Sequence, residues 1–132
     1  MKIKFKYCVP VLLILFAGSS LCAKDFEAKQ KRGAYSFEIK IDRNPPIIGD
    51  NRLEIGLTDN AGASINNAQV LINYYMPPMP RMAPMNYTAP AELKGKNYRA
   101  TLNFIMAGPW IIRVIATHEG VRSVAKFNVD VR

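Results

Sequence analysis

From residue 35 to residue 131, apolar and polar side chains alternate in short runs, and turn-forming residues separate the runs. A period of two residues indicates β-strands with one buried and one solvated face, because successive side chains of a strand point to opposite sides. The sequence shows no convincing 3.6-residue helical period. The pattern therefore restricts the chain to an all-β fold. We predict seven strands, within residues 35–41, 52–58, 70–76, 85–91, 98–106, 110–118 and 125–131.

Seven short strands joined by turns are typical of an immunoglobulin-like antiparallel β-sandwich. Pro90 is expected to make the fourth strand an edge strand, since proline has no backbone N–H to donate. Trp110 begins the sixth strand and is the expected centre of the core. The 132 residues suit one domain, which we place at residues 34–132, behind a polar and mobile leader of residues 24–33.

The first 23 residues differ from the rest of the chain. Lysines at positions 2, 4 and 6 precede an apolar run, residues 8–16, and small residues follow it. This arrangement is typical of a secretory signal peptide, and the run is shorter than the ~20 apolar residues of a membrane-spanning helix. We expect cleavage near Ala23 and export to the periplasm. A lipoprotein acylated at Cys22 is the alternative, which the bulky Leu21 disfavours.

Cleavage would remove both cysteines, Cys8 and Cys22, so the mature chain would have neither a disulfide nor a thiolate ligand. The formal net charge would fall from +8 to +5, and the remaining basic residues are scattered along the chain. Nucleic-acid binding is therefore not expected, and the mature chain is expected to have no integral membrane span.

Residues 76–85 have methionine at every third position and four prolines between them. Proline fixes φ and lacks a donor, so an extended conformation near polyproline II, with ~3 residues per turn, is predicted. This repeat would align four thioethers on one face. Thioethers favour Cu(I) among biological metals, which suggests a Cu(I) or Ag(I) site. The alternative is an adaptable apolar surface. The aligned residues are Met76, Met79, Met82 and Met85.

Antiparallel strands place the methionine segment at one end of the sandwich, together with residues 44–46, residues 106–109 and the chain terminus. Met106 is thus either a core residue or a fifth sulfur ligand. On straight polyproline II, methionines three residues apart are separated by ~9.3 Å. A three-coordinate site therefore requires the loop to bend, at residues 80–82 or 83–84, or to recruit Met106.

His118 is the single histidine, and the strand order places it at the opposite end. The sixth strand alone separates the ends by nearly ~30 Å at ~3.3 Å per residue. A mixed Met/His site within one subunit is therefore not expected. His118 is expected to be a solvated turn residue, with a ligand for a second ion, or in a dimer, as the alternative.

Several short motifs stand out along the chain: Asp50-Asn51-Arg52-Leu53, Gly62, Ala68-Gln69-Val70, Met76-Pro77-Pro78-Met79, Tyr98, Met106-Ala107-Gly108-Pro109-Trp110 and Phe127-Asn128-Val129. Together they resemble the YtkA-like domain family over roughly residues 34–132. The resemblance implies a small exported or membrane-tethered β-sandwich. Such domains occur joined to or near heavy-metal and copper efflux components, and related sequences accompany cytochrome oxidase maturation. Met76 and Met79 match the family motif, whereas Met82 and Met85 are assigned by spacing alone.

These features give one leading hypothesis and two alternatives. An enzyme is not expected, because the mature chain lacks cysteine, has one histidine and shows no nucleophile–base motif. The leading hypothesis is a periplasmic copper-efflux accessory protein that holds Cu(I) or Ag(I) through Met79, Met82 and Met85, with Met76 and Met106, and needs no metal to fold. The first alternative is an interaction module that docks on an efflux adaptor or an oxidase-assembly partner. The second is a loop that absorbs oxidants as methionine sulfoxide.

Overall fold

The computed structural model describes residues 25–132, and the regular elements in this part of the chain are eight β-strands. The predicted signal peptide lies outside the described residues. Within residues 25–132 there is no helix long and apolar enough to cross a membrane. The strands are β1 (Phe26–Arg32), β2 (Tyr35–Ile41), β3 (Gly49–Asp59), β4 (Gln69–Tyr75), β5 (Asn86–Lys94), β6 (Asn97–Phe104), β7 (Gly108–His118) and β8 (Val121–Val131).

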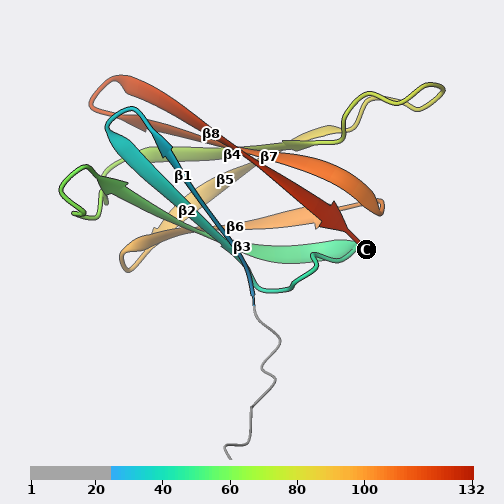
Figure 1. The fold of residues 1–132 in the computed structure, drawn as a ribbon, viewed down its shortest axis with the longest axis horizontal. Coiled ribbons are helices and arrows are strands. Elements are labelled where there is room, and N and C mark those ends of the chain that lie inside the picture. The colour runs from blue at the N-terminus through green and yellow to red at the C-terminus, as the bar shows by residue number, and fades with distance from the viewer. Residues whose placement is uncertain (1–24) are drawn as a thin grey trace, which may run out of the picture.

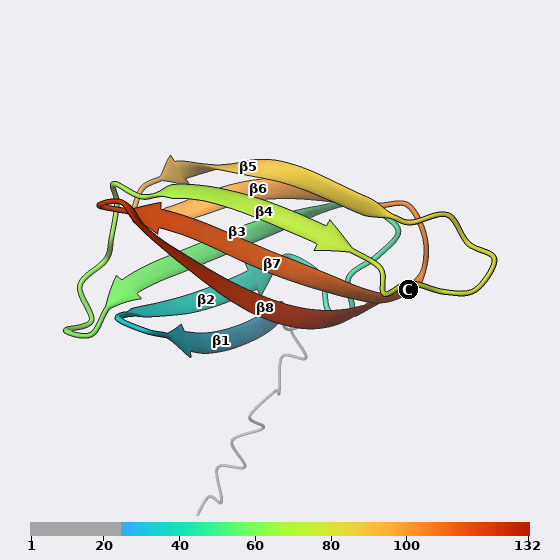
Figure 2. The same ribbon diagram turned by 90° about the horizontal axis from the view of Figure 1, so that it is seen from above.

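All neighbouring strands pair antiparallel in one continuous order, β1-β2-β3-β6-β5-β4-β7-β8. The sheet curls until its two edge strands approach each other (Figure 1, Figure 2). The backbone N–H of Lys126 in β8 donates to Gln30 Oε1 in β1 over 2.8 Å. The all-β antiparallel prediction is confirmed. The immunoglobulin-like sandwich of seven strands is replaced by a nearly barrel-shaped sheet of eight strands.

The additional strand, β1, comes from residues that we predicted as part of a mobile leader. It pairs with β2 along its full length, and Phe26, Ala28 and Gln30 lie opposite core residues of β2. The charged residues of this segment point outward and alternate with the less exposed Phe26, Ala28 and Gln30. Because charged residues predominate, the alternation is weak, and the sequence did not indicate a strand here. The folded part of the chain therefore begins before the predicted boundary at residue 34.

Strand β5 is central in the strand order, whereas we predicted an edge strand. Its residues 86–91 pair with β4, and its residues 92–94 pair with β6. Pro90 lies opposite Leu71 in the part that pairs with β4 alone. The missing N–H of Pro90 is therefore tolerated, because the strand changes partners just beyond this point.

The inward-facing residues are largely those that the period of two predicts. Trp110 is fully buried, as expected of a core residue, and Phe37, Ile55 and Leu102 on three other strands are fully buried as well. The predicted grouping at one end is also confirmed. Arg132 donates its N–H to the carbonyl of Pro46 over 2.9 Å, and Gly108 pairs with Val131.

Candidate functional site

Residues 76–85 form the loop of the β4–β5 hairpin, which we call the methionine loop. It projects beyond the end of the barrel near the C-terminus (Figure 1, Figure 2). The N–H of Met76 donates to the carbonyl of Met85 over 3.1 Å, which closes the base of the loop. At the tip, Met82 N–H lies 3.3 Å from the carbonyl of Met79. The loop is thus a closed hairpin and not a straight polyproline II segment.

The turn at the tip lies at one of the two bends that a shared metal ion requires. Pro80 and Arg81 occupy its two central positions, between Met79 and Met82. Arg81 has φ of +66°, as the third residue of a type II turn requires. Proline in the preceding position favours this turn, because its ring fixes φ. The bend folds Met82 back towards Met79.

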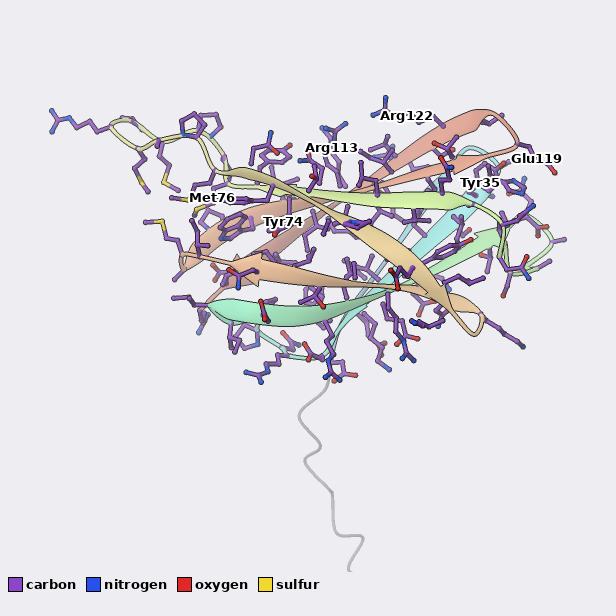
Figure 3. The ribbon with its side chains drawn as sticks, turned by 180° about the vertical axis from the view of Figure 1, so that it is seen from behind. Tyr35, Tyr74, Met76, Arg113, Glu119 and Arg122 are labelled. Atoms are coloured by element: carbon purple, nitrogen blue, oxygen red, sulfur yellow. The ribbon has the colours of Figure 1, made fainter. Side chains whose placement is uncertain are left out.

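The folded loop encloses a cavity of about 230 Å³. All four predicted methionines of the loop line it, and Figure 3 shows yellow sulfur atoms near the labelled Met76. No lining residue has a charged side chain. The lining residues are Tyr75, Met76, Pro77, Pro78, Met79, Met82, Ala83, Pro84, Met85 and Asn86. The cavity therefore offers neutral sulfur donors in apolar surroundings.

The four methionines differ in how firmly the core holds them. Met76 is 7% exposed and belongs to the core, whereas Met82 near the tip is 37% exposed. Met79 and Met85 are half-buried and pack against the core. The site thus has a fixed inner end and an accessible outer end.

Met106, the predicted fifth sulfur ligand, is not among the residues that line the cavity. Its side chain is half-buried and packs against the core. Its carbonyl accepts a hydrogen bond of 2.9 Å from Trp110 Nε1. The structure therefore favours the core role for Met106 over the ligand role.

Gly108 makes room for the inner methionine. A Cβ at this position would lie 2.9 Å from Cε of Met76, closer than ordinary van der Waals contact, and φ of Gly108 is +127°. Only glycine adopts this conformation readily. The space that glycine leaves at the start of β7 therefore accommodates the thioether at the base of the loop, a role that the sequence motif did not reveal.

An aromatic cluster forms the floor beneath the methionine loop. Tyr74 lies 5.6 Å from Tyr87, 5.7 Å from Phe104 and 6.0 Å from Trp110 between ring centroids. The Phe104 and Trp110 rings are 5.2 Å apart in an edge-to-face arrangement. Such pairs add to the stabilisation from burial, so this cluster stabilises the end of the barrel that carries the loop.

Two further motif residues fix loops at the ends of the barrel. Asn51 is 1% exposed, and its side-chain amide makes two hydrogen bonds to the backbone of Ile47. Asn51 Oδ1 accepts from the Ile47 N–H, and Asn51 Nδ2 donates to the Ile47 carbonyl. At the far end, the Tyr98 hydroxyl donates to the carbonyl of Ile65 over 2.8 Å and accepts from Ala68 N–H. Both motif residues therefore have structural roles.

His118 lies at the opposite end of β7 from Gly108, as predicted. Its Nδ1 lies 3.1 Å from the Tyr35 hydroxyl, and the two rings meet edge to face (Figure 3 labels Tyr35). The side chain is 15% exposed, so the predicted solvated turn residue is in fact half-buried against β2. A single-subunit site that combines it with the methionine loop is excluded by this placement.

The donor set of the methionine loop fits a soft, monovalent ion. Thioethers are neutral and soft, and the neutral lining adds no charge that would favour a divalent ion. Among residues 25–132, no group of three or more His, Cys, Asp or Glu side chains is placed to hold a metal.

Comparison with known proteins gives one match. A family model described as YtkA-like matches residues 29–115, which include β2 to β6, the methionine loop and most of β7. No curated protein and no solved structure matches the chain.

Proposed function

The chain belongs to the YtkA-like family, and from this premise we propose that it is an exported, non-catalytic accessory protein that holds Cu(I) or Ag(I) in the methionine loop. The ion is cargo in this proposal, and the protein folds without it. The family supports a location outside the cytoplasm, and the signal-peptide pattern of the first 23 residues agrees with export to the periplasm.

One observation carries the proposal: four thioethers line a single cavity that a turn closes. A soft donor set of this kind selects Cu(I) or Ag(I) over harder ions. Thioethers need no deprotonation before they bind, so affinity should persist at acidic pH. The accessible Met82 would receive the ion first, and the inner methionines would hold it.

The direct test is anaerobic competition for Cu(I) against a calibrated chelator, with the protein from residue 24 onwards. We expect the combined variant Met79→Leu, Met82→Leu and Met85→Leu to bind Cu(I) at least about 100-fold more weakly, since leucine keeps the volume and removes the sulfur. Met106→Leu is the matched control, because Met106 lies outside the cavity. Unchanged affinity in the combined variant would reject the proposal. Trp110, the single tryptophan, reports whether each variant is folded.

A second candidate function is an interaction module, whose partner would be a metal-efflux or oxidase-assembly protein of the envelope. Apolar side chains exposed at the same end favour it. Ile48 is 52% exposed, Ile105 is 51% exposed, and Met82 lies beside the cavity. Exposed apolar side chains gathered at one place can mark a protein interaction site. Leucine at the three loop positions would preserve such docking and abolish Cu(I) binding, so the same variant separates the two functions.

A further inference from the structure

The outward face of β4, β7, β8 and the first part of β5 is unusual for a solvated sheet face. Its cross-strand rows are given by the strand register. The central row is apolar and runs from Pro90 through Leu71 and Ile115 to Val124. Leu71 is 41% exposed. An outward row without any polar side chain predicts contact with something other than water.

Cationic side chains flank this apolar row on both sides. On one side, Arg113 lies opposite Lys126, and on the other, Arg122 lies opposite Thr117. Figure 3 shows Arg113 and Arg122 on the same outer side of the strands. We call the apolar row, together with Arg113, Arg122 and Lys126, the cationic face.

The three cations have no carboxylate partner in the described part of the chain. The ion pairs within 4.0 Å among residues 25–132 include none of them. The one carboxylate on this side of β8, Asp130, pairs with Arg132 at 3.8 Å. Arg113 Nη1 lies 3.4 Å from Asn73 Oδ1, and its Nε is buried without a hydrogen-bond partner. An incompletely satisfied guanidinium is the group that a carboxylate completes best.

The opposite outer face, on β1, β2, β3 and β6, has the reverse character. Charges of alternating sign cross it in one row, and Lys40 lies 3.7 Å from Glu27. Such a row neutralises itself and remains solvated. The row is Glu27, Lys40, Glu54, Arg99 and Glu92. On the cationic face, by contrast, the cross-strand rows that hold Arg113, Lys126 and Arg122 contain no carboxylate.

We propose that the cationic face docks a partner protein that presents carboxylates beside apolar side chains. Charge complementarity selects this partner. A second copy of the chain, facing the first, would bring like charges together. A lipid surface requires apolar groups that penetrate it by ~5–10 Å. On this face Ile115 and Val124 are half-buried in the sheet, so they suit contact with a protein surface better than insertion into lipid.

Backbone amide NMR of the folded protein tests the proposal with defined probes. The first probe is a short, soluble peptide of Glu and Leu residues, and the matched probe has Lys in place of every Glu. We expect the acidic peptide to shift amides of β4, β7 and β8, and the basic peptide to shift none of them. Binding should weaken with added salt, because the Debye length falls from ~8 Å at 0.15 M to ~3 Å at 1 M.

Variants then assign the effect to the three cations. We expect Arg113→Gln, Arg122→Gln and Lys126→Gln together to weaken acidic-peptide binding by about tenfold. The combined variant Lys40→Gln, Arg52→Gln and Arg99→Gln, on the opposite face, is the matched control and should bind normally. Arg122→Glu with Lys126→Glu changes only exposed side chains. If loss of Arg113 harms folding, this second variant still tests the proposal, and we expect it to weaken acidic-peptide binding in a folded protein.

Three outcomes would overturn the proposal. One is the absence of shifts with the acidic peptide, and another is equal loss of binding in the control variant. The third is binding to vesicles that contain phosphatidylglycerol, with the same amides shifted and no response to the acidic peptide, which would assign this face to a membrane surface.

Discussion

The two ends of the barrel differ in whether their potential metal ligands are available to bind an ion. At one end, four thioethers line a cavity and Met82 is 37% exposed. At the other, the ring of His118 packs on Tyr35, with Nδ1 3.1 Å from its hydroxyl. The single histidine is the more familiar metal ligand, but it is engaged in structure. The comparison teaches that a candidate metal site is better chosen by whether its donor atoms are available than by how often that residue type is a ligand.

The largest expected effect is a loss of stability when the aromatic cluster beneath the methionine loop is disrupted. Trp110→Ala removes the largest fully buried side chain and its hydrogen bond to the Met106 carbonyl. We expect the free energy of unfolding to fall by about 3–5 kcal/mol, as for other buried large-to-alanine changes. Urea denaturation followed by circular dichroism measures this. A loss below about 1 kcal/mol would show that the aromatic cluster does not support this end.

The second effect compares glycines at the two ends. Gly108→Ala introduces a Cβ 2.9 Å from Cε of Met76, whereas Gly120, in the β7–β8 turn, has open space around it. Both glycines have positive φ, so both alanine variants carry backbone strain, of about 1–3 kcal/mol. We expect only Gly108→Ala to weaken Cu(I) binding as well, by about tenfold, because Met76 must move. Equal Cu(I) affinity in the two variants would show that Met76 is not a ligand of the proposed site.

A smaller effect concerns the histidine end. Tyr35→Phe removes the hydroxyl next to His118 Nδ1, and we expect a loss of about 0.5–1.5 kcal/mol in the free energy of unfolding. Cu(I) affinity should stay the same, because this end has no part in the proposed site. A change in affinity beyond about twofold in the competition assay would break the distinction between the two ends.

The smallest expected effect is that of pH. Thioether ligands do not titrate, so the Cu(I) affinity of the methionine loop should change by less than about twofold between pH 7 and pH 5. A site with an imidazole ligand would lose affinity as pH falls through ~6.5, because the proton competes with the metal. Competition at several pH values, corrected for protonation of the chelator, measures this. A decline in affinity towards acidic pH would point to histidine.

The alternating pattern predicted the all-β class and the inward faces of most strands, because burial imposes a period of two directly on the sequence. The pattern did not predict that the edge strands β1 and β8 approach each other and nearly close the sheet into a barrel. Phe26, Ala28 and Gln30 face inward in a segment rich in charge. The contact between Gln30 and Lys126 joins residues that are distant in sequence. Strand switching in β5 depends on neighbours that a single strand's sequence does not identify.

The candidate site could be predicted in part. Spacing singled out the four methionines of the loop, and geometry predicted a bend at residues 80–82 or 83–84. The structure has a turn at the first of these positions. The cavity, the exclusion of Met106 from it and the space left by Gly108 depend on tertiary contacts. No local pattern encodes those contacts, so the sequence alone left open whether Met106 is a core residue or a fifth sulfur ligand.

X-ray absorption spectroscopy of the Cu(I)-loaded protein tests the central claim most directly, because it identifies the atoms bound to copper. The account predicts a first shell of sulfur alone, which is lost when Met79, Met82 and Met85 are replaced by leucine. A first shell that contains nitrogen, and that disappears in His118→Gln, would contradict it and transfer the metal to the opposite end of the barrel.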